Sequence, residues 1–171
     1  MYSFKNRLNA LFFFTLLMLT LLSIGNVLTT IFAEKDVQVD FQFSHTETFR
    51  VDRVINEDKG ILVFSLRTNL TSLFDWNTNL IFAWLTCEYE SPKSAYNRVT
   101  VWDKIVKREF KNEQLIDLQS ETVEYPISDV YKKLKGRKVN VFFNWEHMPI
   151  VGINYKGRKH VGEFTMPSEY T

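Results

Sequence analysis

The run ALFFFTLLMLTLLSIG, residues 10–25, is the centre of an uncharged stretch that extends from Leu8 to Ala33. Charged residues flank it on both sides: Lys5 and Arg7 before it, and Glu34, Lys35 and Asp36 after it. As a helix, these 26 residues would be about 39 Å long, against about 30 Å for the hydrocarbon core of a bilayer. The sequence therefore predicts one membrane-spanning helix, because only a helix satisfies its own peptide groups in lipid.

A cleaved secretory signal is the main alternative to an uncleaved anchor. The basic start, the apolar core and the small-x-small sequence Ser23-Ile24-Gly25 are typical of a signal peptide that is cut after Gly25. Apolar residues continue beyond that site, from Val27 to Ala33, and this favours the anchor. A soluble core helix is disfavoured, because residues 11–22 contain only two threonines and no polar stripe.

The charges around the span predict its orientation. Positive flanks stay on the cytoplasmic side of a membrane, and Lys5 and Arg7 precede the span. The sequence thus predicts a cytoplasmic N-terminus (1–7), a transmembrane signal-anchor helix (8–33) and a domain in the lumen or the exterior (34–171). Cleavage of a signal would deliver the same domain to the same compartment.

The 138 residues after the span suit a single domain with its own core. Of the 21 basic residues in the chain, all but Lys5 and Arg7 fall there, so 19 basic and 20 acidic residues give a net charge of −1. This balance does not favour nucleic acid as a partner. The single cysteine, Cys87, cannot form an intrachain disulfide, so the domain depends on hydrophobic packing or on partners.

Apolar and polar residues alternate with a period of two through this domain, as in strands with one buried face. The expected strands are 37–43, a weaker 49–51, 62–70, 80–89, 98–107, two short strands within 115–125, 139–145, and an edge strand at 161–166. Ser128 is expected to cap a brief helix through Lys135 that Gly136 ends. Many short strands with turns between them predict an all-β fold, an antiparallel β-sandwich preceded by a single N-terminal transmembrane helix.

No catalytic, cofactor-binding or metal-binding residues are predicted. The three histidines, His45, His147 and His160, lie far apart in the sequence and have no further ligand at metal-site spacing. The sequence contains neither a glycine-rich phosphate loop nor a nucleophile elbow. Cys87 lies in a strand that is apolar on both faces, which favours an inert packing residue over a nucleophile paired with His45.

Three other features of the sequence lead to further predictions. Asn69-Leu70-Thr71 is a glycosylation sequon. The basic cluster from Lys132 to Lys138 is expected to be a solvated helix end, with contact to lipid headgroups or a partner as the alternative. The tryptophans are expected to be mostly core residues, with polar neighbours that hydrogen-bond at strand corners: Trp76, Trp84, Trp102 and Trp145.

Five blocks of the sequence are distinctive: NLTSLFDWNTN (69–79), Glu88-Tyr89, NRVTVWDKIV (97–106), FNWEHMP (143–149) and PSEY (167–170). Together they resemble subunit 3 of the eukaryotic signal peptidase complex, the SPC22/23 family. The short basic N-terminus and the single apolar span fit the same pattern. The resemblance covers essentially the whole chain.

The resemblance implies a single-pass type II protein of the endoplasmic reticulum membrane with a lumenal C-terminal domain. In that family this subunit is not the protease. It binds and stabilises the catalytic serine protease subunit, which cleaves signal peptides from nascent secretory and membrane proteins. The implied partners are that subunit, the other subunits of the complex and the lipids of the membrane. The catalytic serine of that superfamily precedes a methionine, and this chain has no Ser-Met pair.

The family motifs also suggest structural or interface residues. They are Phe74, Asp75, Trp76, Asn77, Trp102, Asp103, Lys104, Trp145 and Pro149. Some members carry a sequon in the strand at 139–145, but Asn140 is not part of one here, so a glycan is expected at Asn69 alone. The resemblance favours the uncleaved anchor over a secreted binding module released after Gly25.

Overall fold

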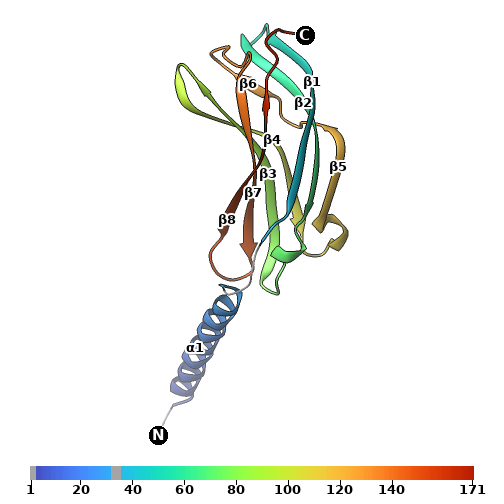
Figure 1. The fold of residues 1–171 in the computed structure, drawn as a ribbon. Coiled ribbons are helices and arrows are strands. Elements are labelled where there is room, and N and C mark those ends of the chain that lie inside the picture. Colours follow the sequence, from blue (N-terminus) through green and yellow to red (C-terminus); the bar gives the residue numbers. More distant parts are fainter. Residues whose placement is uncertain (1–2, 32–35) are drawn as a thin grey trace.

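The N-terminal segment is a single long helix, α1, from Phe4 to Ile31. The computed structural model describes residues 3–31 and 36–171. The helix begins four residues before the predicted span, and Phe32 and Ala33 lie outside the described residues. Its segment Phe4–Thr29 is apolar and long enough to cross a membrane, and it stands apart from the strands (Figure 1).

The remaining described residues form eight strands in two antiparallel sheets, which confirms the predicted all-β class. One sheet has the order β1-β2-β5, with β6 also paired to β2, and the other has the order β4-β3-β7-β8. The strands are β1 Val39–Asp52, β2 Glu57–Asn69, β3 Thr78–Ser91, β4 Ser94–Lys107, β5 Leu115–Thr122, β6 Ile127–Asp129, β7 Lys138–Pro149 and β8 Tyr155–Thr165. Two short 3-10 helices, η1 Thr71–Leu73 and η2 Lys111–Gln114, join them.

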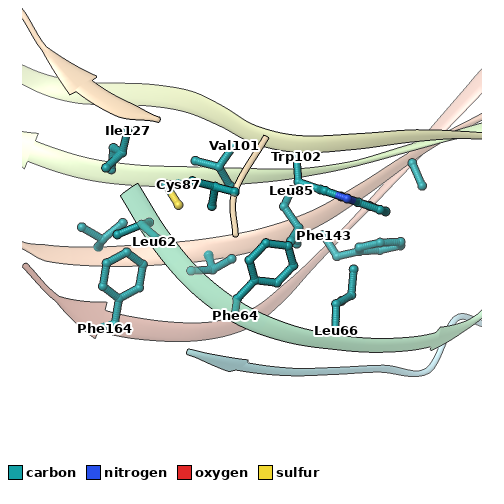
Figure 2. Close-up of a cluster of buried hydrophobic side chains, with 14 of the residues drawn as sticks. Leu62, Phe64, Leu66, Leu85, Cys87, Val101, Trp102, Ile127, Phe143 and Phe164 are labelled. Atoms are coloured by element: carbon teal, nitrogen blue, oxygen red, sulfur yellow. The ribbon is translucent and has the colours of Figure 1, made fainter. Parts of the chain in front are cut away.

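The core lies between the two sheets and follows the alternation of the sequence. Every second residue of β2, β3 and β7 faces inward, which brings Phe64 and Leu66 of β2 opposite Leu85 of β3 and Phe143 of β7 (Figure 2). Phe43 of β1 stacks on Phe164 of β8, with ring centroids 4.2 Å apart. Side chains from the two edge strands thus cover one side of the sandwich.

The contact between Trp145 and Gly157 joins β7 and β8 within one sheet. The two residues are paired across the strands, and the indole ring lies over the glycine. A Cβ atom at position 157 would lie 2.1 Å from Cζ2 of Trp145. Only glycine leaves room for this ring, although the backbone at position 157 needs no unusual conformation.

Strands β1 and β5 differ from the expected pattern. The predicted weak strand at 49–51 is the end of β1, which runs on through polar residues 44–48 with two register shifts. An edge strand tolerates such bulges. The two strands expected within 115–125 are one strand, β5, in which Ser120 has a positive φ of 52°.

The brief helix predicted from Ser128 to Lys135 is wrong. Ile127–Asp129 is the short strand β6, paired with β2, and Ile127 is fully buried. The Asp129 carboxylate then accepts the backbone N–H of Lys133 at 2.7 Å. This side chain bonds a backbone group that a helix would have used, and Lys132 has a positive φ of 54°. Gly136 has a positive φ of 61°, as expected for a residue that ends a segment.

The free edge of the β4-β3-β7-β8 sheet at β8 is charged. Strand β8 is an edge strand, as predicted for 161–166, but it starts earlier, at Tyr155. It carries Lys156, Arg158 and Lys159, all of which are partly exposed.

Candidate functional site

The predicted motif at residues 74–77 lies where the sandwich meets α1. We call Asp75, Asn77, Thr78 and His147, together with the loop 150–154 between β7 and β8, the helix-proximal corner. Figure 1 places this loop beside the C-terminal end of α1. The short helix η1 and the start of β3 bring the motif to the same end of the domain.

Asn77 holds the β7–β8 loop in place. Its side chain is almost fully buried; Nδ2 donates to the carbonyl oxygen of Val151 at 2.8 Å, and Oδ1 accepts the N–H of Val151 at 3.1 Å. The N–H of Ile150 donates to the backbone oxygen of Asn77 at 2.7 Å. Asp75 in turn accepts the N–H of Asn77 at 2.9 Å. The corner hydrogen bonds expected for this motif are confirmed.

His147 is the central residue of the corner, and the sequence did not single it out as a site residue. It is buried, and its Nε2 is hydrogen-bonded to Oγ1 of Thr78 at 2.7 Å. Its ring stacks on the ring of Tyr155, with the two ring centroids 4.4 Å apart. Burial raises the pKa of Tyr155, and the carboxylate of Asp75 raises it further. His147 pairs with Ile81 in the register of β3 and β7, and its ring reaches Thr78 from there. The contact is not visible in the sequence, because 69 positions separate the two residues.

The four tryptophans differ in their burial. Trp102 and Trp145 are buried, as expected, and Trp84 is half-buried and stacks on Phe82. Trp76 is 54% exposed, so the expectation that it is a core residue is wrong. The reason is its place in the loop before β3, where Arg108 bonds its carbonyl oxygen at 2.7 Å and no sheet covers its ring.

The other predicted residues fall into two groups. Pro149 pairs with Thr78 across β7 and β3, so it belongs to the helix-proximal corner. Trp102, Asp103 and Lys104 pair with Leu85, Trp84 and Ala83 midway along the β3–β4 pairing, so the structure does not bring them to the corner. They form part of the paired sheet rather than a site with the 74–77 motif.

Asn69, the predicted glycosylation residue, is the last residue of β2 and is exposed. Its Oδ1 accepts the N–H of Thr71 at 2.9 Å, a turn that leaves the Nδ2 side of the amide directed away from this bond. Asn69 and Thr71 of the sequon are exposed, and Leu70 between them is buried.

A charged cluster lies on the outer face of the β4-β3-β7-β8 sheet. Glu88 of β3 is nearly buried and bonds Arg98 and Arg158, each at 2.5 Å, as well as the hydroxyl of Tyr96 at 2.7 Å. Burial opposes the charge of Glu88, but the hydrogen bonds from Tyr96 and the two arginines outweigh it and lower the pKa of the carboxyl. The three charges together form an ion-paired network rather than a free acid.

The opposite end of the sandwich holds two buried carboxylates. We call Asp58, Asp129, Tyr89 and Tyr170 the helix-distal cluster. Asp58 and Asp129 face each other across β2 and β6, and their exposed fractions are 0% and 4%. Asp58 accepts hydrogen bonds from Tyr170 at 2.8 Å and from the N–H of Leu134 at 3.2 Å. Asp129 accepts one from Tyr89 at 3.1 Å.

The basic residues 132–138 belong to this distal end and lie in the connection between β6 and β7 and at the first residue of β7, not at a helix end. Lys132 donates a hydrogen bond to the side-chain oxygen of Asn56. The Nζ atom of Lys135 lies 3.4 Å from the ring centroid of Tyr170, and Lys138 forms an ion pair with Glu163 at 2.8 Å. Figure 1 shows this end of the domain away from α1. That position does not favour the lipid-headgroup alternative for the membrane that α1 would enter.

The residues of these clusters hydrogen-bond and pack against one another, and they hold strands and loops in place. Burial raises the pKa of the Cys87 thiol to about 12, so this side chain stays a thiol at neutral pH and is a packing residue, as predicted. Within residues 3–31 and 36–171, no three His, Cys, Asp or Glu side chains gather in a way that could hold a metal ion.

Comparison with known proteins supports the resemblance stated above. The family model described as signal peptidase subunit (SPC22) matches residues 1–169. A protein named signal peptidase complex subunit 3 from Dictyostelium discoideum is 29% identical over 173 residues, 99% of this chain and 97% of that protein. The Homo sapiens protein of the same name is 34% identical over 154 residues, covering 86% and 84% of the two chains. Adipocyte-related X-chromosome expressed sequence 1 of Mus musculus is 34% identical, covering 90% and 87%.

Proposed function

The chain belongs to the signal peptidase subunit family, and from this membership we propose that it is a non-catalytic subunit of the endoplasmic reticulum signal peptidase complex. The family match over residues 1–169 is the observation that carries the proposal. In this role the chain binds and stabilises the catalytic serine protease subunit, which removes signal peptides from nascent proteins. The inert Cys87 and the fully paired Glu88 agree with a binding role.

The proposal includes a single-pass type II topology. Residues 1–7 face the cytosol, α1 crosses the membrane, and residues 34–171 lie in the lumen, where Asn69 can receive a glycan. Lys5 and Arg7 on the N-terminal side support this orientation. The alternative is a secreted β-sandwich released by cleavage after Gly25. Against it, α1 continues without interruption from Gly25 to Ile31.

Two measurements test the role in the complex. The full chain, purified through an affinity tag in mild detergent, should carry a serine protease subunit with it. Depletion of the chain should leave secretory precursors with their signal peptides, and re-expression of the full chain should restore cleavage. Normal processing in cells that lack the chain would refute the proposal.

The topology is tested separately. N-terminal sequencing of the mature chain should find the region that starts at Met1, whereas a start at Asn26 would support release. In sealed microsomes, residues 34–171 should resist added protease until detergent opens the vesicles. Substitution of Asn69→Gln should remove any glycan, with Asn140→Gln as the matched control outside a sequon.

A further inference from the structure

The β7–β8 loop of the helix-proximal corner is strongly apolar and exposed. Its residues are Ile150, Val151, Gly152, Ile153 and Asn154, and no charged residue lies between His147 and Lys156. Ile150 is 62% exposed and Ile153 is 88% exposed. Two exposed isoleucines on a loop of five residues form an apolar patch, and such patches mark contact with another protein or with a membrane.

The loop touches α1 before the helix ends. A Cβ atom on Gly152 would lie 3.1 Å from Cγ2 of Val27. Val27 precedes Ile31, the last helical residue, by four residues, about 6 Å along the helix axis. The loop therefore reaches back alongside the apolar part of the helix rather than ending beyond it.

The loop is held firmly in this position. Asn77 bonds Val151 through both its donor and its acceptor, and its backbone oxygen binds Ile150. On the same end of the domain, the exposed ring of Trp76 precedes Asn77 directly. Tryptophan is enriched at membrane–water interfaces, where its apolar ring and its N–H group find suitable surroundings.

We propose that the β7–β8 loop inserts into the bilayer that holds α1, with Ile150 and Ile153 in the outer part of the acyl chains and Trp76 at the level of the headgroups. This inference rests on the proposed function in one respect, that α1 crosses a membrane. If a membrane surrounds Val27, then a loop in contact with Val27 lies at lipid depth. The domain is thereby fixed in height and tilt against the membrane surface by a second point besides its helix.

Position-specific fluorescence in liposomes tests the insertion, and the chain is well suited to it. Cys87 is the single cysteine and is buried, so Cys87→Ala provides a background in which one new cysteine is labelled. The probe positions are Ile153→Cys in the loop, Val54→Cys at the opposite tip and Leu19→Cys in α1. Val54 is the matched control, because it is an apolar residue that is 93% exposed in the turn between β1 and β2.

The expected result separates the three positions. Iodide should quench the probe at position 153 about five-fold less than the probe at position 54, because a hydrated anion does not enter hydrocarbon. Lipids with a spin label near the headgroup should quench position 153, and lipids with a deep label should quench position 19. Equal iodide quenching at positions 153 and 54 would overturn the insertion.

The experiment distinguishes a wrong topology for α1 from a wrong position for the β7–β8 loop. If position 19 is also open to iodide, α1 is not in the bilayer and the proposed topology is wrong. If position 19 is shielded and position 153 is not, the anchor stands and the insertion is refuted. Shielding of position 153 only after the other subunits are added would identify a protein as the occupant of this surface, and it would also refute the insertion.

Discussion

The two ends of the sandwich are built from different polar chemistry. At the helix-proximal corner the buried groups are an amide, a hydroxyl and an imidazole, those of Asn77, Thr78 and His147. In the helix-distal cluster they are two carboxylates, Asp58 and Asp129, with tyrosine hydroxyls and backbone N–H groups around them. The one carboxylate of the corner, Asp75, is half-buried.

The two ends differ in what it costs to bury their polar groups. A buried carboxylate is costly unless every acceptor site is bonded, and a nearby lipid phase increases the cost. The distal end, which faces water, surrounds its carboxylates with donors and basic residues. The corner beside α1 instead buries an amide, a hydroxyl and an imidazole, and its carboxylate, Asp75, is only half-buried. We expect mutations to affect the two ends in different ways.

The largest loss of stability is expected at Trp145, in the half of the sandwich nearer to α1. Trp145→Ala should lower the free energy of unfolding by about 3–5 kcal/mol, because the ring is buried and fills the space over Gly157. The matched control Trp76→Ala, an exposed ring of the same chemistry, should change it by about 0.5 kcal/mol or less. Chemical unfolding of the full chain in detergent measures both values. Equal losses would show that exposure does not separate the two rings.

The second-largest loss of stability is expected in the helix-distal cluster, at Asp58. Asp58→Ala should cost about 3 kcal/mol, because it leaves the hydroxyl of Tyr170 and the N–H of Leu134 without their charged acceptor. Asp117→Ala serves as a control, since its ion pair with Arg67, at 3.7 Å, is on the surface. The same unfolding measurement applies. A loss no larger than that of the control would mean that the buried carboxylate does not stabilise this end.

A smaller and local effect is expected at the corner. Asn77→Ala removes the two hydrogen bonds to Val151 and should cost about 2 kcal/mol. Hydrogen–deuterium exchange should rise in the β7–β8 loop and remain unchanged in the turn between β1 and β2. A variant that loosens both ends alike would contradict the separation of the two networks.

The smallest effect is a dependence on pH. Because the pKa of Glu88 is lowered in the folded chain, its contribution to stability is present above the ordinary carboxyl value of 4.5 and is lost as the pH falls through the folded value. Exchange in the β3–β4 hairpin, expressed relative to the intrinsic amide exchange rate at each pH, should therefore rise in acid. The Glu88→Gln variant should lack this rise, and the corner should show little of it. An unchanged hairpin in acid would contradict the prediction.

The sequence predicted the class of the fold, since the period-two pattern survives in the core strands. Leu62, Phe64 and Leu66 do face inward, as their alternation indicated. It failed where a short polar side chain bonds the backbone, as Asp129 does to Lys133, because such a bond replaces the helix that local preferences favour. It also failed for Trp76, since an aromatic residue in a loop is buried only if another element covers it.

Most of the corner could not be predicted. The motif at residues 74–77 was found by resemblance, but its partners come from β7 and the loop after it, which are about 70 residues away. The contact of His147 with Thr78 depends on the register of two paired strands, and Gly157 is explained only by the ring of Trp145. The role of each of these residues depends on a contact with a partner far away in the sequence. A single sequence does not show which residues form such contacts.

The charged edge strand β8 matters before the chain meets its partners. An uncapped strand with open N–H and C=O groups is a template for joining a second copy, and repeated joining ends in aggregates. Lys156, Arg158 and Lys159 place long charged side chains along this edge, each paired with a carboxylate. A second copy that added a strand to β8 would have to rearrange or bury these ion pairs, so edge-to-edge association is disfavoured.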